Sequence, residues 1–257
     1  MRFTERFFLV LLVIALLIPL SLSGCQKAAE DTSLSDIKKS GTIVVATDDT
    51  YPPLEYNEDG KIVGYDMDFM SEIASRLGVK VEFVSTKWDG LLTGLIGKQY
   101  DAVISSMNVT EERLKEAAFV EYQRWSQVIV VSPSAPEAKT LADLEGKRIA
   151  VQISTTSEEM AKTVKDAHVT SFESFDTTFM ELKNGRADAI IIDEPVAMYY
   201  QKLDPSAFVV TGTASEKAPV GIAIRKDASA LVSAITKAVE DMRKDGTAAR
   251  IYGEWFE

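Results

Sequence analysis

The sequence predicts an α/β protein built from mostly parallel sheets that are covered by helices. Apolar, β-branched segments such as 43–47, 79–84 and 101–105 alternate with segments such as 66–77, in which apolar residues recur at helical spacing. This alternation favours a parallel sheet, because each helix returns the chain to the edge from which the next strand starts. The length of 257 residues allows one or two domains.

Two segments with similar patterns indicate a second lobe that resembles the first. Residues 91–105 and 179–193 both read as a helix, a glycine, a short turn, an Asp-Ala pair, an apolar strand and a polar strand end. The spacing from the glycine to Asp101 and to Asp188 differs by one residue. The similarity can be a coincidence among common strand–helix units, or it can mean two lobes that each present a polar strand end to one cleft.

Turn and cap residues bound the other predicted elements. They are a hairpin around 57–60, a helix at 88–96 and a strand at 126–132 that leaves the first lobe. Further elements follow in chain order: a short helix at 141–147, a strand at 148–152, a helix from near 158, a helix at 177–183, strands at 187–192 and 208–210, a second crossing strand at 220–225, a helix at 228–245 and a short final helix.

Residues 102–113 are the most informative stretch for function. A short apolar strand ends in small hydroxyl and amide side chains, and Thr110 is a typical N-cap for the helix that follows. Open α/β sheets bind ligands at the carboxyl ends of their strands. Arg113 is expected one turn into the helix, where a guanidinium beside free backbone N–H groups can bind a carboxylate or a phosphate. A capped turn with an ordinary surface arginine also explains the pattern.

The N-terminal residues predict export. Arg2 and Arg6 precede an apolar run from Phe7 to Leu20, which is shorter than the ~20 residues of a membrane-spanning helix. We expect residues 1–24 to be a cleaved signal peptide, with an uncleaved anchor as the alternative. The sequence Leu-Ser-Gly-Cys at 22–25 resembles a bacterial lipobox, which implies a lipid-modified Cys25. Residues 25–36 are polar and are expected to form a flexible, lipid-anchored tether.

Composition argues against several classes of protein. The formal net charge of −11 disfavours binding to nucleic acid or to an anionic membrane surface. The chain has one histidine, His168, and one cysteine, so we expect no metal site and no intrachain disulfide. The sequence contains neither a Ser-His-Asp set with a recognisable nucleophile elbow nor a glycine-rich phosphate-binding loop. We therefore expect no cofactor and favour a protein that is not an enzyme.

Several motifs, in order along the chain, resemble the bacterial extracellular solute-binding proteins for polar amino acids, family 3, the soluble receptors of ABC importers. They are GYDMDF at 64–69, WDGLL at 88–92, SSMNVT at 105–110 with Arg113, and DGT at 245–247. The resemblance implies the two-lobed periplasmic-binding-protein fold (type II), in which two strands cross between the lobes and a hinge closes them on the ligand. It places lobe 1 at 37–129 and 222–257, and lobe 2 at 132–220.

The resemblance also implies a binding site for a free α-amino acid. Arg113, with backbone N–H groups near Asn108 and Thr156, would bind the α-carboxylate. Asp193 would bind the α-ammonium with help from the Ser106 hydroxyl. A helix N-cap is the alternative role of this aspartate, because a proline follows two residues later.

The side chain of the ligand would meet three further residues. Tyr51 and Trp88 stand at positions that sandwich it, and Asp48 is placed at its far end. Aromatic faces with a carboxylate suit a guanidinium or ammonium group, so arginine or lysine is expected first, and glutamine or histidine next. Two positions depart from the family's pattern. Asn108 stands where many members have Ser or Thr. Ser154 stands where many have glycine, so the backbone conformation at this position is not predicted.

The resemblance therefore predicts a monomeric receptor outside the cytoplasm that is held at the membrane only by its N-terminal lipid and passes its ligand to an ABC importer. The alternative is an enzyme on the same fold, a cyclohexadienyl or prephenate-type dehydratase. Such an enzyme needs a general acid in the cleft. An Asp193 that is paired with a cation stays ionised and is a poor proton donor.

Overall fold

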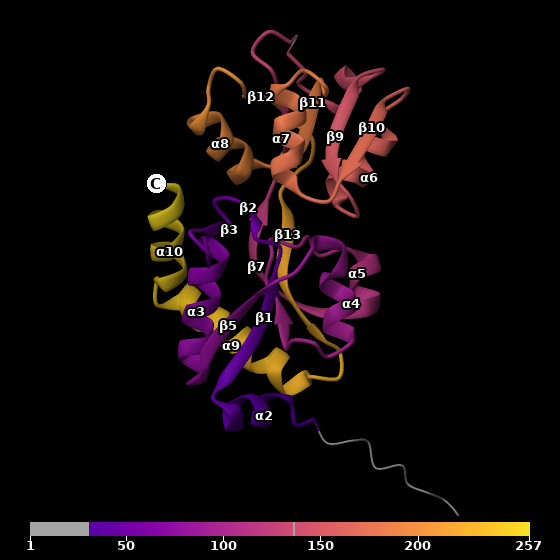
Figure 1. Ribbon diagram of the computed structural model, residues 1–257. Helices are drawn as coiled ribbons and strands as arrows, with labels where there is room; N and C mark the ends of the chain where they lie inside the picture. The colour runs from indigo at the N-terminus through magenta and orange to yellow at the C-terminus, as the bar shows by residue number, and fades with distance from the viewer. Residues whose placement is uncertain (1–30, 136) are drawn as a thin grey trace, which may run out of the picture. The chain divides into compact units, whose positions relative to one another are not determined.

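The computed structural model describes residues 31–135 and 137–257, which contain two five-stranded sheets (Figure 1). We call the sheets and their helices lobe 1 and lobe 2. The predicted signal peptide and Cys25 lie outside the described residues. The sheet of lobe 1 has the order β5 (Lys80–Ser85), β1 (Thr42–Thr47), β6 (Ala102–Val103), β13 (Ala218–Arg225) and β7 (Ala117–Trp125). The sheet of lobe 2 has the order β10 (His168–Phe172), β9 (Arg148–Gln152), β11 (Ala189–Asp193), β8 (Gln127–Val131) and β12 (Val209–Thr213).

Lobe 1 is covered by helices on both faces of its sheet. Strand β1 is parallel to β5 and β6, whereas β13 is antiparallel to β6 and β7. Ile43 and Val45 pack with α3 (Tyr65–Leu77) and α9 (Ser229–Lys244), and Ala46 packs on the other face with α4 (Leu91–Ile96). Both faces are buried because alternate residues of β1 are apolar on each side. The predicted sheet with flanking helices is confirmed, but the prediction that the sheets are mostly parallel is wrong. Each sheet is mixed, with two parallel and two antiparallel pairings, because the strands next to the crossings, β13 and β8, run against their neighbours.

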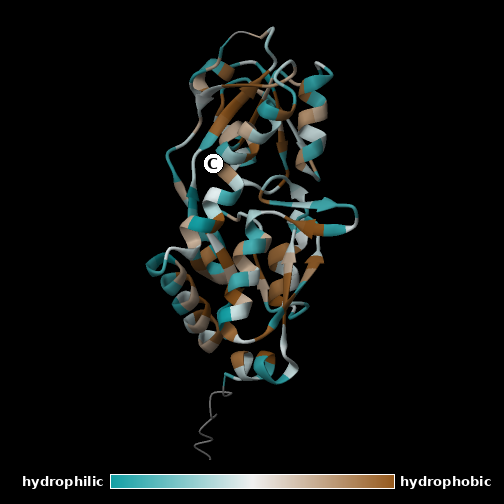
Figure 2. Ribbon diagram, turned by 90° about the vertical axis from the view of Figure 1, so that its left-hand side faces the viewer, coloured by the Kyte–Doolittle hydropathy of each residue, from teal (hydrophilic) through white to brown (hydrophobic). Residues whose placement is uncertain are grey.

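Lobe 2 has the same layered construction. Strand β9 is parallel to β10 and β11, and β8 is antiparallel to β11 and β12. Ile190 and Ile192 pack with α7 (Phe175–Lys183) and α8 (Glu194–Leu203), while Ile191 packs towards α6 (Thr156–Thr163). In Figure 2 the hydrophobic residues concentrate on the strands and on helix faces turned towards them.

The chain crosses between the sheets twice, at Ser126 and at residues 214–217. Both crossings lie a few residues from the predicted boundaries. Residues 127–129, placed in lobe 1 by the sequence, belong to the sheet of lobe 2, because β8 pairs along its whole length with β11. Residues 218–220 belong likewise to the sheet of lobe 1, because β13 pairs with β7 from Ala218 onward.

The expected tether at 25–36 overlaps a helix. Helix α2 (Ser33–Ser40) starts within that range and buries Ile37 against the core. Ahead of it, the Asp31 carboxylate accepts hydrogen bonds from the Ala230 N–H (2.6 Å) and the Ser229 hydroxyl (2.9 Å) at the start of α9. The folded part of the chain therefore begins no later than Asp31.

The remaining elements are short. They are β2 (Thr50–Tyr51), β3 (Glu55–Glu58), β4 (Lys61–Val63), η1 (Trp88–Gly90), α5 (Glu111–Glu116), η2 (Leu141–Leu144) and α10 (Thr247–Phe256). The predicted hairpin around 57–60 is confirmed as the turn between β3 and β4. Within residues 31–135 and 137–257, every helix is too short or too polar to cross a membrane.

Candidate functional site

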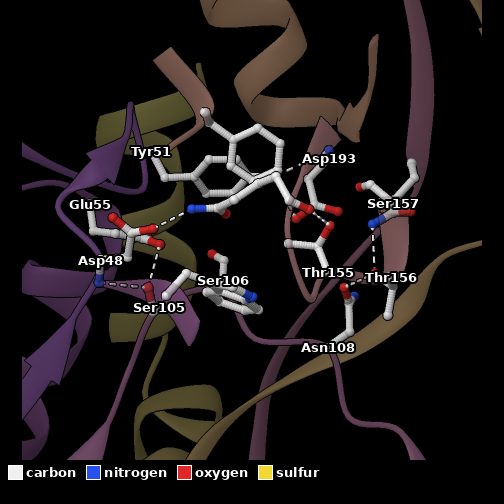
Figure 3. Close-up of a pocket in the computed structure, with 14 residues that line it drawn as sticks. Asp48, Tyr51, Glu55, Ser105, Ser106, Asn108, Thr155, Thr156, Ser157 and Asp193 are labelled. Carbon is white, nitrogen blue, oxygen red and sulfur yellow. Dashed lines mark hydrogen bonds between the residues drawn. The ribbon is translucent and has the colours of Figure 1, made fainter. Parts of the chain in front are cut away.

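A cavity of about 340 Å³, counting space open to solvent, lies between the polar strand ends of the two lobes. Lobe 1 contributes Asp48, Tyr51, Glu55, Trp88, Ser105, Ser106 and Asn108, and lobe 2 contributes Gln127, Gln152, Thr155, Thr156, Ser157, Phe175 and Asp193. The predicted site residues in this lining are Asp48, Tyr51, Trp88, Ser106, Asn108, Thr156 and Asp193. Figure 3 shows Asp48 and Glu55 on one side of the cavity and Asp193, Asn108 and Thr156 on the other.

Asp193 ends β11 and is 3% exposed. Its Oδ2 accepts a hydrogen bond from the Tyr51 hydroxyl (3.0 Å), and its backbone N–H donates to the same hydroxyl oxygen (3.3 Å). Burial raises the pKa of Asp193 to about 6, against the lowering effect of the Tyr51 bond and the Arg113 charge. Within the described chain its Oδ1 has no hydrogen-bond partner, and its side chain makes no cap bond to α8. The side chain therefore offers a free acceptor in the cavity instead of capping the helix.

Asp48 follows β1 and is fixed by three hydrogen bonds. Its backbone N–H donates to the Ser105 hydroxyl oxygen (3.0 Å), and its Oδ1 accepts from the Thr50 hydroxyl (2.9 Å). Its Oδ2 accepts from Gln152 Nε2 in lobe 2 (2.6 Å). Burial raises the pKa of Asp48 to about 6, although the bonds from Gln152 and Thr50 lower it. The cavity thus contains a second fixed carboxylate.

Aromatic rings form part of the wall between these two carboxylates. Tyr51 lies against Phe175, the first residue of α7, with ring centroids 4.5 Å apart. Trp88 donates its Nε1–H to the Ser154 carbonyl oxygen (3.1 Å), which ties lobe 1 to lobe 2. Phe175 was not predicted, because a phenylalanine at a helix start reads as core in the sequence.

Arg113 lies beside the cavity, outside the residues that line it. Its guanidinium donates to the carbonyl oxygens of Asn108 (2.9 Å) and Ser154 (3.2 Å), and its Cζ lies 5.2 Å from the centroid of the Trp88 ring. Desolvation lowers its pKa, against the charges of Glu159 and Asp193. The predicted N-cap is confirmed, since the Thr110 hydroxyl accepts from the Arg113 N–H (3.2 Å).

The structure shows how the chain accommodates Ser154 at a position where many family members have glycine. Its φ is +60°, in the left-handed region that glycine adopts most easily. Its N–H donates to Glu158 Oε2 (2.8 Å), which holds the turn in this conformation. Serine therefore follows the backbone path of a glycine, and its carbonyl oxygen meets both Arg113 and Trp88.

A chain of side-chain hydrogen bonds closes the cavity near the predicted carboxylate site. Gln127 Nε2 donates to the Thr156 hydroxyl oxygen (2.9 Å), and that hydroxyl donates to Asn108 Oδ1 across the lobes (2.7 Å). The sequence pointed only to the backbone N–H groups near Asn108 and Thr156. Their side chains join the lobes as well.

Two buried acids that were not predicted support the floor of the site. Glu55 is 1% exposed and accepts from the Ser105 hydroxyl (3.0 Å), while Asp66 is 0% exposed and accepts from the Ser106 N–H (2.8 Å) and the Tyr122 hydroxyl (2.6 Å). Burial, and then the charge of Asp66, raise the pKa of Glu55 well above its ordinary value. Through these hydrogen bonds the pair fixes the turn at 105–106.

No metal-ligand cluster accompanies these acids. In the described part of the chain, no group of three or more His, Cys, Asp or Glu side chains could hold a metal ion.

Comparisons with known proteins agree on one family. Residues 43–257 match the family model described as bacterial extracellular solute-binding proteins, family 3. An L-cystine-binding protein of Escherichia coli (strain K12) is 33% identical over 232 residues, which cover 89% of this chain and 87% of that protein. An arginine-binding extracellular protein of Bacillus subtilis (strain 168) is 32% identical over 254 residues, covering 96% and 97% of the two chains.

Solved structures agree with the fold. An ancestral arginine-binding protein bound to arginine has a TM-score of 0.82 and 41% identity, over 84% of this chain and 99% of its own. The predicted two-lobed periplasmic-binding-protein fold is thereby confirmed.

Proposed function

The chain belongs to family 3 of the bacterial extracellular solute-binding proteins, and from this premise we propose that it binds a basic L-amino acid, arginine or lysine, for delivery to an ABC importer. Relatives named for the binding of cystine and of arginine support an amino-acid ligand without choosing between them. Glutamine and histidine are the next candidates.

The charge balance of the cavity carries this proposal. Asp48 and Asp193 are buried acids on different sides of one cavity, and its fourteen lining residues include no Lys or Arg. Arg113, beside the cavity, supplies one positive charge. A basic amino acid has one carboxylate and two cations and complements this set. A neutral amino acid would leave one buried carboxylate without a cation, which costs several kcal/mol.

Each end of the ligand has a proposed partner. Asp193, with its free Oδ1, takes the α-ammonium with help from the Ser106 hydroxyl. Arg113 uses two of its five N–H donors on backbone carbonyls, which leaves donors for the α-carboxylate, together with the N–H groups near Asn108 and Thr156. Asp48 takes the distal cation.

Aromatic side chains would flank the aliphatic part of the ligand. Tyr51, Phe175 and Trp88 line the cavity between its two acidic ends. Their faces attract cations as well as packing against methylene groups.

We infer the remaining roles from the sequence and from contacts between the lobes. Leu22-Ser23-Gly24-Cys25 supports a lipid-anchored receptor outside the cytoplasm. The bonds from Asp48, Tyr51 and Trp88 to residues of lobe 2 support closure by a hinge at the two crossings.

Titration calorimetry on unfolded and refolded protein tests the proposal, because refolding strips any bound ligand. The titrants are the twenty amino acids and L-cystine. We expect arginine or lysine to bind most tightly, and Asp48→Asn to shift the preference towards glutamine. Asp101→Asn is the matched control, since Asp101 binds the Val44 N–H (2.9 Å) outside the cavity and should leave the preference unchanged. Tightest binding of an acidic or apolar amino acid would contradict the proposal.

One observation favours the dehydratase alternative: Glu55 lines the cavity, and its pKa is raised, as a general acid requires. Its Oε1 is occupied by the Ser105 hydroxyl, and burial and the charge of Asp66 raise its pKa, which opposes the release of a proton to a substrate. We expect no turnover when the refolded protein is incubated with a prephenate-type cyclic acid. Product formation that is lost in Glu55→Gln would establish the enzyme instead.

A further inference from the structure

We propose that Gln152 determines specificity at the distal end of the cavity, where it favours the guanidinium of arginine over the ammonium of lysine. This inference rests on the proposed binding of a basic amino acid. It concerns a residue that the sequence did not single out.

Gln152 is a buried amide with a fixed orientation. It is the last residue of β9 and is 1% exposed. Its Nε2 donates to two acceptors, Asp48 Oδ2 (2.6 Å) and the Glu173 carbonyl oxygen (2.9 Å). A flipped amide would place its oxygen against a carboxylate and a carbonyl, so both acceptors exclude that orientation. Gln152 Oε1 is therefore fixed as an acceptor beside Asp48.

The same bond orients the Asp48 carboxylate. Gln152 holds Oδ2 and the Thr50 hydroxyl holds Oδ1, so each oxygen has one protein donor. A carboxylate has about four acceptor positions, so one position on each oxygen remains. These two positions and Gln152 Oε1 form a set of three neighbouring acceptors.

A guanidinium fits such a set better than an ammonium does. It has five N–H donors in one plane and binds both oxygens of a carboxylate at once. An ammonium is a compact point charge that cannot match two parallel acceptors in the same way. The Tyr51 and Phe175 rings, tilted by 34° with centroids 4.5 Å apart, also line the cavity and offer aromatic surface to a cation.

Gln152 also joins lobe 2 to lobe 1 through Asp48, so its loss could weaken closure on every ligand. The two roles differ in one measurable quantity. A residue that only holds the lobes together changes the affinities for arginine and lysine by the same factor. A residue that contacts the distal group of the ligand changes the ratio of the two affinities.

The test compares Gln152→Met with wild type by calorimetric titration of L-arginine and L-lysine. We expect wild type to bind arginine at least about tenfold more tightly than lysine, and Gln152→Met to lose most of this ratio, as for one charge-assisted hydrogen bond. Gln127→Met is the matched control, because Gln127 lines the cavity but bonds to Thr156 instead of Asp48. Gln127→Met should lower the affinities for arginine and lysine by the same factor. Gln152→Ala replaces Gln152→Met if the latter does not fold.

If the Gln152 variants lose affinity for arginine and for lysine by the same factor, the inference is overturned and the proposed function still stands. A wild-type protein that binds the two ligands equally would also overturn it. Wild type that binds neither ligand would overturn the proposed function and the inference with it.

Discussion

Replacing Asp193 with asparagine is expected to stabilise the ligand-free protein while it weakens ligand binding. The carboxylate is 3% exposed, one of its oxygens has no partner within the described chain, and its pKa rises from 3.8 to about 6 on folding. At about 1.4 kcal/mol for each pH unit, this difference corresponds to about 3 kcal/mol. Asparagine keeps an oxygen for the Tyr51 hydroxyl and removes the buried charge.

The sign of this effect depends on pH. Between pH 3.8 and about 6, the folded protein holds a proton at Asp193 that the unfolded chain has lost. Stability contributed by this group therefore falls as pH rises through that window, and the full cost applies above it. Asp193→Asn should gain up to about 3 kcal/mol near neutral pH and nothing near pH 3.5.

Thermal melts at neutral and acidic pH, with and without saturating arginine, measure both effects. For a chain of this size, the gain corresponds to a melting temperature roughly 5–10 °C higher at neutral pH. Added arginine should raise the melting temperature of wild type far more than that of the variant. A ligand-free variant that melts at or below wild type at neutral pH would refute this reasoning.

Asp188→Asn provides a control of opposite sign. Asp188 precedes β11 and pairs with Arg148 Nη2 at 2.6 Å, and this bond lowers its pKa. Its loss should lower the melting temperature at neutral pH and leave the response to arginine intact.

Three further predictions follow from the site and its supports. Arginine affinity should be constant above pH 7 and fall at least about tenfold per pH unit below 6 in calorimetry, as Asp48 and Asp193 take up protons; a flat profile would contradict this assignment. Ser154→Gly should relieve the φ of +60° and raise the free energy of unfolding by about 1 kcal/mol in denaturant titrations. Gly64→Ala should destabilise far more than Gly78→Ala, because only the first places a Cβ 2.1 Å from the Leu54 carbonyl oxygen; equal losses of melting temperature would count against that clash.

Local patterns were sufficient for the strand ends that form the site. Ser106, Asn108 and Asp193 each follow an apolar strand, and the carboxyl ends of parallel strands meet at one edge of a sheet. Their assigned contacts with a ligand remain predictions. Arg113 was predicted beside the site, but its bond to the Ser154 carbonyl oxygen joins residues 41 positions apart and has no local signal.

Other features depend on partners that a single segment does not reveal. Gln152 and Asp48 are 104 residues apart, so a glutamine at a strand end gave no sign of its role. Glu55 reads as a solvated hairpin residue until the fold places Ser105 against it. Strands β7 and β10 were not predicted, because each lies at a sheet edge and mixes polar with apolar residues.

The order of strands also determines the order in which the chain can fold. All five strands of lobe 2 come from the continuous segment 127–213, whereas β7 joins the sheet of lobe 1 only through β13, at residues 218–225. A chain synthesised from its N-terminus therefore presents every strand of lobe 2 before lobe 1 can complete its sheet. Until residue 225 has emerged, the edge of β6 that pairs with β13 has no partner and is exposed to aggregation.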